Sequence, residues 1–205
     1  TLRQNYGLLN VEKNEKENQS SVLEPMVKAV LVADERTLWL EEVIDGLAAQ
    51  DYKKIEFLLI LTGEEKANSD VEDLIKRVFP DSKIVRTSNT TNYALLANLV
   101  LRDDLTEFRE SFFLFLKDDV ILDATCVRRM VELAVGSNAG IVGPKVLDRE
   151  NPSQLEDMGS MLDNFYSPVG RSEKGENDQG QHDEKEISAT PESVMLIRAD
   201  LFRAI

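Results

Sequence analysis

The sequence is poor in the residues that form cross-links and common catalytic clusters. It has one cysteine, Cys126, in 205 residues, which excludes an intramolecular disulfide framework and a zinc site built on several thiolates. Cys126 falls where a helix is predicted to begin, and a small buried side chain is favoured there over a reactive thiol. The one histidine, His182, has no serine or cysteine motif near it, so a hydrolase triad has little support.

Long apolar and basic stretches are also lacking. No run of 18 apolar residues occurs, so no membrane span is predicted, and no signal peptide is visible. The formal net charge is −14 with no Lys/Arg-rich run, which argues against nucleic acid as a partner. Neither Gly-x-Gly-x-x-Gly nor Gly-x-x-x-x-Gly-Lys-Ser/Thr follows the first predicted strand, so dinucleotide-binding and P-loop proteins lose their main support.

The composition is that of an ordinary globular protein, with 42% hydrophobic and 30% charged residues. Residues 1–25 are polar and without periodicity, and they predict a disordered or extended lead-in or linker. A single α/β domain is expected over 26–205. The chain starts at a threonine, so we expect that residues upstream have been removed. Because it ends inside an apparent helix, we also expect a domain truncated at its C-terminal side.

From residue 27 onward, buried strands alternate with amphipathic helices, which predicts a three-layer α/β/α fold with a mostly parallel sheet. Right-handed crossovers are expected to bring every strand's carboxyl end to one edge, where ligands bind. The predicted strands are Val27–Ala33, Ile55–Leu61, Lys83–Arg86, Phe112–Leu116, Gly140–Gly143 and Val194–Ile197, and the predicted helices are Leu38–Gln50, Val71–Val78, Tyr93–Leu101 and Val127–Val135. Between them, 148–186 is polar and predicts a long loop, either a functional lid or a disordered segment.

Two acidic pairs follow predicted strands. Asp118 and Asp119 end the fourth strand, where they either bind a divalent metal that carries a diphosphate or form a solvated loop or helix cap. Asp34 and Glu35 end the first strand, where they either contact a base or ribose or cap the next helix. His182 lies in the polar segment Asp178–Asp183 and is expected to be solvated on this evidence alone.

Taken in order, several segments resemble family 2 glycosyltransferases with the GT-A fold, particularly an actinobacterial-type branch. The resemblance runs from about residue 27 to 205 and rests on six segments in register rather than on one decisive motif. They are Val30–Leu40, Leu47–Gln50, Asn92–Asn98, Phe115–Asp119 in place of an Asp-x-Asp motif, Ile141–Lys145 and Asp178–Asp183.

The resemblance implies a role for several of these residues. Asp34 or Glu35 would face the nucleotide base, and Asp119 would bind the divalent metal, Mn or Mg. Asp118 would lie beside the sugar or its diphosphate, and Asn98 near the donor pocket. The loop with His182 and Asp183 would cover the diphosphate.

Departures from the family pattern lie at three places. Leu61 stands where an acidic residue is usual, the glycines expected at Asn92 and Ala94 are absent, and Lys117 replaces a histidine or aspartate. Lys117 is expected either to pair with a phosphate or to weaken metal binding by repulsion. No match to the family's catalytic aspartate occurs before Ile205, so the base is unassigned and is expected beyond that residue.

Together these features predict a metal-assisted, inverting glycosyltransferase domain that uses a nucleoside-diphosphate sugar. The acceptor would be a glycan, a cell-wall polymer or a lipid-linked molecule, and the isolated chain is expected to be inactive. A cytoplasmic location is expected, or one at the cytoplasmic membrane face through regions outside this chain. The alternative is a degenerate, non-catalytic GT-A-like module for interaction or regulation, favoured by Leu61, Lys117 and the missing glycines.

Overall fold

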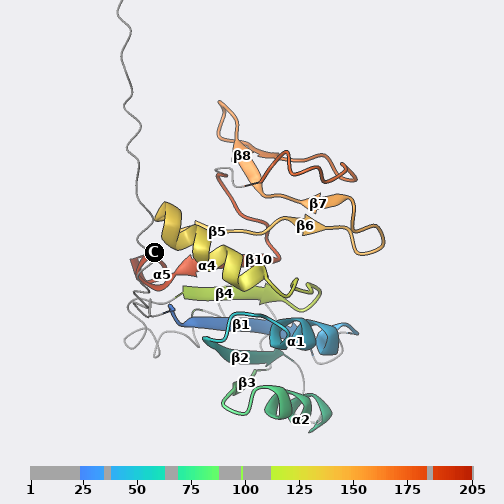
Figure 1. Cartoon of the computed structure of the whole chain (residues 1–205), viewed down its shortest axis with the longest axis vertical. Helices are drawn as coiled ribbons and strands as arrows, with labels where there is room; N and C mark the ends of the chain where they lie inside the picture. The colour runs from blue at the N-terminus through green and yellow to red at the C-terminus, as the bar shows by residue number, and fades with distance from the viewer. Residues whose placement is uncertain are drawn as a thin grey trace, which may run out of the picture.

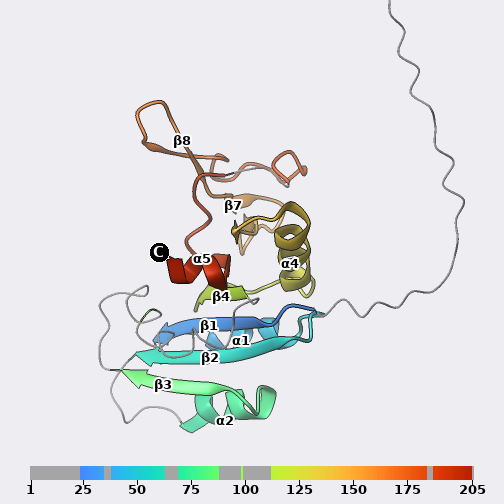
Figure 2. The ribbon, with the colours of Figure 1, turned by 90° about the vertical axis from the view of Figure 1, so that its left-hand side faces the viewer.

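The computed structural model describes residues 24–34, 38–62, 69–87, 98, 112–183 and 187–204. Figures 1 and 2 show a central sheet with helices beside it and a group of short strands beyond one end of the sheet. The elements, in chain order, are β1 (Val27–Asp34), α1 (Leu40–Ala48), β2 (Ile55–Thr62), α2 (Ser69–Val78), β3 (Lys83–Thr87), β4 (Phe112–Lys117), α4 (Cys126–Ser137), β5 (Ile141–Val142), β6 (Val146–Leu147), β7 (Leu155–Asp157), β8 (Ser160–Leu162), β9 (Pro168–Gly170), β10 (Val194–Arg198) and α5 (Ala199–Ala204).

The described strands include a six-stranded sheet in the order β3-β2-β1-β4-β10-β5. β1 pairs in parallel with both β2 and β4, and β2 pairs in parallel with β3. The predicted α/β fold with a mostly parallel sheet is therefore confirmed. The helix predicted over Tyr93–Leu101 lies outside the described residues except for Asn98, which is helical and exposed.

One expectation about the sheet is wrong: the carboxyl ends of the strands do not all lie at one edge. β10 runs antiparallel to β4 and to β5. The crossover rule applies to parallel strands joined by a helical connection, whereas β10 follows the long segment 143–193 and enters the sheet from the opposite side. Its amino end therefore lies at the edge where β1 and β4 finish.

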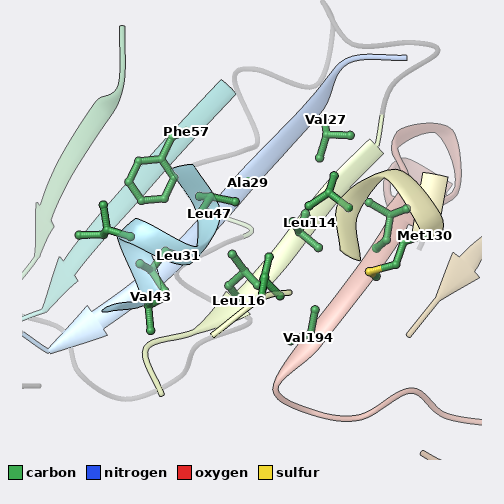
Figure 3. Packing of buried hydrophobic residues seen from close by; sticks show 14 of the residues in the cluster. Val27, Ala29, Leu31, Val43, Leu47, Phe57, Leu114, Leu116, Met130 and Val194 are labelled. Atoms are coloured by element: carbon green, nitrogen blue, oxygen red, sulfur yellow. The ribbon is translucent and has the colours of Figure 1, made fainter. Parts of the chain in front are cut away.

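The core lies on both faces of the sheet because the side chains of each strand alternate between them. On one face, Ala29, Leu31 and Leu114 pack under α1 and α4, as Figure 3 shows. On the other face, Val30 and Phe113 belong to a second cluster that includes side chains of α5. Burial on both faces explains why the first, second and fourth strands read as continuous apolar runs.

Helix α1 shows how the local sequence specifies the layer on the first face. Its four buried residues, Leu40, Val43, Ile44 and Leu47, recur at helical spacing. α4 likewise buries one stripe and ends at Asn138, whose left-handed φ of 55° is a common helix terminus. Its first residue, Cys126, packs against this core, and burial raises the pKa of its thiol to about 11. The thiol is therefore protonated at neutral pH.

The segment predicted as a long loop over 148–186 contains three short strands. β6 pairs with β7 and β8 pairs with β9, both antiparallel. In both views these pairs lie beyond the end of the sheet opposite β3. The Ser160 amide donates to the carbonyl of Ala189 over 2.9 Å, which connects the base of the β8–β9 hairpin to the residues just before β10.

A buried amide, Gln50, connects the end of α1 to the start of α4. Gln50 is 1% exposed, and its Nε2 donates to the carbonyl oxygens of Gly46 and Asp123 over 2.9 and 2.7 Å. Its Oε1 accepts the amide hydrogen of Val127 over 3.0 Å. One side chain thus satisfies three backbone groups, two of them 73 and 77 residues away in sequence.

Replacing this amide should destabilise the fold strongly. Gln50→Leu leaves the buried Val127 amide without its partner, which costs about 1–3 kcal/mol. It also removes the side-chain hydrogen bonds to the carbonyls of Gly46 and Asp123. We expect urea denaturation to show a loss of about 2–5 kcal/mol in the free energy of unfolding. Glu41→Gln, an exposed change on the same helix, should stay within about 0.5 kcal/mol. A Gln50→Leu variant as stable as wild type would contradict this role for the amide.

Candidate functional site

The ends of β1 and β4 lie side by side and bring two of the predicted site residues into contact. Val32 is paired with Lys117 in the parallel ladder, so the residues after Val32 and those after Lys117 leave the sheet at neighbouring positions. The amide of Asp34 donates a hydrogen bond to Oδ2 of Asp118 over 3.1 Å. Both residues are half-buried, and Asp119 is exposed. The carboxylates of the two strand ends therefore border the same edge of the sheet, here called the donor edge.

The reversed strand β10 adds a residue that the sequence did not single out. The Lys117 amide donates to the carbonyl of Ser193 over 3.0 Å, which brings Glu192 beside the end of β4. The Lys117 ammonium lies 3.4 Å from Oε2 of Glu192. Glu192 was missed because its place depends on the direction of β10, and a run such as Val194–Ile197 reads equally well either way.

The backbone before β10 is held by close packing against the end of β5. Pro191 is buried, whereas Glu192 is exposed. A Cβ atom at Gly143 would lie 2.8 Å from Cδ of Pro191 and 2.9 Å from Cβ of Thr190. Gly143 is thus required by close approach of two segments, and it keeps residues 190–192 next to the donor edge.

His182 and Asp183 belong to an ordered loop, here called the 176–183 loop. Lys145, three residues after β5, lies 2.7 Å from Oδ2 of Asp178 and 2.9 Å from Oδ1 of Asp183. His182 Nε2 lies 3.0 Å from Oε1 of Glu176. The hydrogen bond from Lys145 is the main reason that the pKa of Asp178 is lowered. Lys145 therefore holds the loop against the end of β5.

A second contact joins the segment after β6 to the start of α1. The guanidinium of Arg149 lies over the ring of Trp39, 3.7 Å from its centroid. The same guanidinium bonds Glu42 over 2.5 Å. Since α1 begins just after β1 leaves the sheet, Arg149 connects the 148–150 segment to the region of the donor edge, a contact of the cation–π type.

The other predicted site residues cannot be placed at this edge. Glu35 lies outside the described residues, as does the Asn92–Asn98 segment apart from its last residue. Asn98 is described alone, so its relation to Asp34 and Asp118 stays a prediction.

Asp118 and Asp119 offer carboxylate oxygens, the type of ligand that a divalent metal such as magnesium binds. Within the described ranges, no group of three or more His, Cys, Asp or Glu side chains is placed to hold a metal ion. Magnesium is commonly held by one or two carboxylates together with substrate phosphates. Asp118 and Asp119 at the end of β4 match that smaller requirement.

The overall fold is similar to that of several solved transferases. A fragment of S. aureus TarS, residues 1–349, gives a TM-score of 0.54 at 12% identity, covering 87% of this chain and 48% of that fragment. The mannosyltransferase PcManGT from Pyrobaculum calidifontis, solved with GDP-Man and Mn²⁺, gives 0.55 at 12% identity, covering 89% and 47%. This chain has the GT-A fold.

The similarity to these structures is one of fold, and it covers part of the length of each. The chain spans about half the length of the TarS fragment and of PcManGT. A 4-diphosphocytidyl-2C-methyl-D-erythritol synthase also shares the GT-A fold, with a TM-score of 0.52 at 14% identity over 89% of this chain and 79% of that one. No protein-family model and no curated protein sequence matches the chain. Since one fold serves different reactions, the site must decide the function.

The described part of the chain contains no helix that is both long and apolar enough to cross a membrane.

The contact between Lys145 and Asp178 predicts a pH dependence of the 176–183 loop. The pKa of Asp178 is lowered in the folded chain, so its ionised carboxylate stabilises the fold. This stabilisation is fully present above the ordinary aspartate pKa of about 3.9 and is lost as the pH falls through the lower pKa of the folded chain. In Lys145→Met the NMR titration midpoint of Asp178 should rise towards the ordinary value. Lys174→Met, which removes the 2.7 Å pair with Glu156, is the control and should leave the midpoint unchanged. An unshifted midpoint in Lys145→Met would show that this contact does not form in solution.

Proposed function

We propose that the chain is a glycosyltransferase domain that takes a sugar from a nucleoside-diphosphate donor. The observation that carries the proposal is the hydrogen bond between the Asp34 amide and the Asp118 carboxylate, since it unites two acidic strand ends at the carboxyl edge of a GT-A sheet. In open α/β sheets, ligands bind outside the carboxyl ends of the strands. The solved relatives support this choice of ligand, because TarS was solved with UDP and with UDP-GlcNAc, and PcManGT with GDP-Man.

Each residue at the donor edge has a distinct proposed task. Asp34, or the adjacent Glu35, accepts hydrogen bonds from the base or ribose. Asp118 is already oriented by the backbone of β1 and faces the sugar and its diphosphate. Lys117 supplies a positive charge to a phosphate, which a compact ammonium does well. Asn98 and the loop that carries His182 are proposed to complete the donor site.

A divalent cation, Mn²⁺ or Mg²⁺, is the proposed cofactor, and Asp119 is the proposed protein ligand. When bound, the cation would neutralise the negative charge that develops on the leaving nucleoside diphosphate. Asp119 suits this task because it is exposed and adjoins Asp118, whose carboxylate accepts a backbone hydrogen bond. The presence of Mn²⁺ with GDP-Man in the PcManGT structure supports the assignment.

The chemistry proposed is inverting transfer to a hydroxyl of a glycan, a cell-wall polymer or a lipid-linked acceptor. A carboxylate base removes the proton from the acceptor hydroxyl, which attacks the anomeric carbon in line with the departing diphosphate. The chain's own contribution is to bind and orient the donor. No described residue is assigned as the base.

A degenerate, non-catalytic module is the second candidate, and two observations favour it. Leu61, where an acidic residue is usual in the family, is 1% exposed at the end of β2 and belongs to the core. The Lys117 ammonium is paired with Glu192, which removes positive charge from the donor edge. Nucleotide binding that depends on metal distinguishes the enzyme from the module.

The first test is nucleotide binding with and without Mn²⁺. UDP and GDP are titrated into the chain by calorimetry, and at least one should bind in a Mn²⁺-dependent way. Asp119→Ala should weaken that binding at least about tenfold, as loss of a metal-supporting group does. Asp73→Ala, an exposed aspartate on α2, controls for the loss of one negative charge and should bind like wild type. Indifference to both nucleotides would favour the non-catalytic module.

The second test is turnover by the isolated chain. We expect donor binding without transfer to an added glycan acceptor, because no described residue is assigned as the base and the chain spans about half of the TarS fragment and of PcManGT. Release of UDP or GDP from the sugar nucleotide is the measurement. Multiple turnovers with an acceptor would contradict the expected inactivity and place a base within this chain.

A further inference from the structure

We propose that Glu192 is a positioning residue of the donor edge, which holds the Lys117 ammonium until the diphosphate of the donor displaces it. The proposal rests on the function proposed above and adds a residue and an exchange of partners to it. It follows from the reversed direction of β10, the exposure of the ion pair and the charges around Lys117.

The direction of β10 places Glu192 at the donor edge. β10 is antiparallel to β4, with Val194 paired to Leu116. The residues before Val194 therefore extend past the carboxyl end of β4, and the Lys117 amide bonds the Ser193 carbonyl over 3.0 Å. An acidic residue in the segment before β10 thus lies at the donor edge, although it is separated from Lys117 by 75 residues.

The backbone at residues 190–192 is held by close packing, while the Glu192 side chain is exposed. Pro191 is buried against Gly143, where there is no room for a Cβ atom. Glu192 itself is exposed, with 90% of its side chain accessible. The carboxylate is therefore presented from a firm backbone position and can leave Lys117 by side-chain rotation alone.

The charges around Lys117 favour an exchange of its partner. Lys117 is followed directly by Asp118 and Asp119, so an approaching diphosphate meets two carboxylates and needs a nearby cation. The ion pair between Lys117 and Glu192 spans 3.4 Å, and the Lys117 side chain is 40% exposed. Such exposed pairs are weak and screened by salt, whereas a phosphate that carries more charge is a stronger partner for the ammonium. The donor can therefore replace Glu192.

This exchange predicts opposite effects from the two partners. Glu192→Gln keeps the size of the side chain but removes the competing charge, so binding of UDP or GDP should tighten about two- to fivefold. Lys117→Met removes the cation and should weaken binding. In the double variant the effect of Glu192→Gln should vanish, because the residue acts through Lys117.

A calorimetric titration of four proteins in Mn²⁺ tests the proposal: wild type, each of the two single variants and the double variant. Glu132→Gln is the matched control. Glu132 is also an exposed glutamate in a weak ion pair, 3.3 Å from Arg128, on α4 away from the donor edge. The Glu132→Gln variant removes the same single charge and should leave the affinity for UDP or GDP unchanged. All variants change exposed side chains, so their thermal unfolding should stay close to wild type.

Three outcomes would overturn the proposal. The first is nucleotide binding by Glu192→Gln that is unchanged or weaker than that of wild type. The second is an effect of Glu192→Gln on nucleotide affinity that is the same with Lys117 and with Met at position 117. Equal tightening by Glu132→Gln would show a general charge effect instead. In all three cases wild type still binds, so the proposed function stands. A wild-type chain that binds neither UDP nor GDP would reject the proposed function and this exchange together.

Discussion

The parallel pairing of β1 with β4 is the constraint on which the site depends. The ladder runs from Val27 opposite Phe112 to Val32 opposite Lys117. The segments that follow β1 and β4 therefore leave the sheet at the same level. The Asp34 amide and the Asp118 carboxylate then meet. A shift of this register by one residue would move Phe113 and Phe115 to the face that Leu114 and Leu116 occupy. It would also displace Asp118 from the Asp34 amide. The core therefore specifies the position of the site.

Much of the framework follows from the sequence because burial leaves a clear pattern. Strands covered on both faces read as mainly apolar runs, and α1 and α4 show a buried stripe at helical spacing. The meeting of Asp34 and Asp118 could be predicted from the rule that parallel strands end at one edge. Glu192 could not, because an apolar run such as that of β10 carries no sign of its direction.

The segment between β5 and β10 is the part that sequence patterns describe least well. Its strands are two or three residues long, too short to show periodicity. Its order comes instead from individual polar contacts, such as Lys145 with Asp178 and Arg149 with Glu42. Such contacts depend on which side chains the fold brings together, and no local sequence pattern predicts them. They anchor the segment to the end of β5 and to the start of α1.

The central claim is that a nucleoside diphosphate binds at the shared end of β1 and β4. Hydrogen–deuterium exchange of the full chain, with and without UDP or GDP in Mn²⁺, tests it most directly. The account predicts slower exchange at Asp34, at Asp118 and Asp119, and at Glu192 and Ser193 when nucleotide is present. Protection confined to other surfaces, with these amides unchanged, would contradict it.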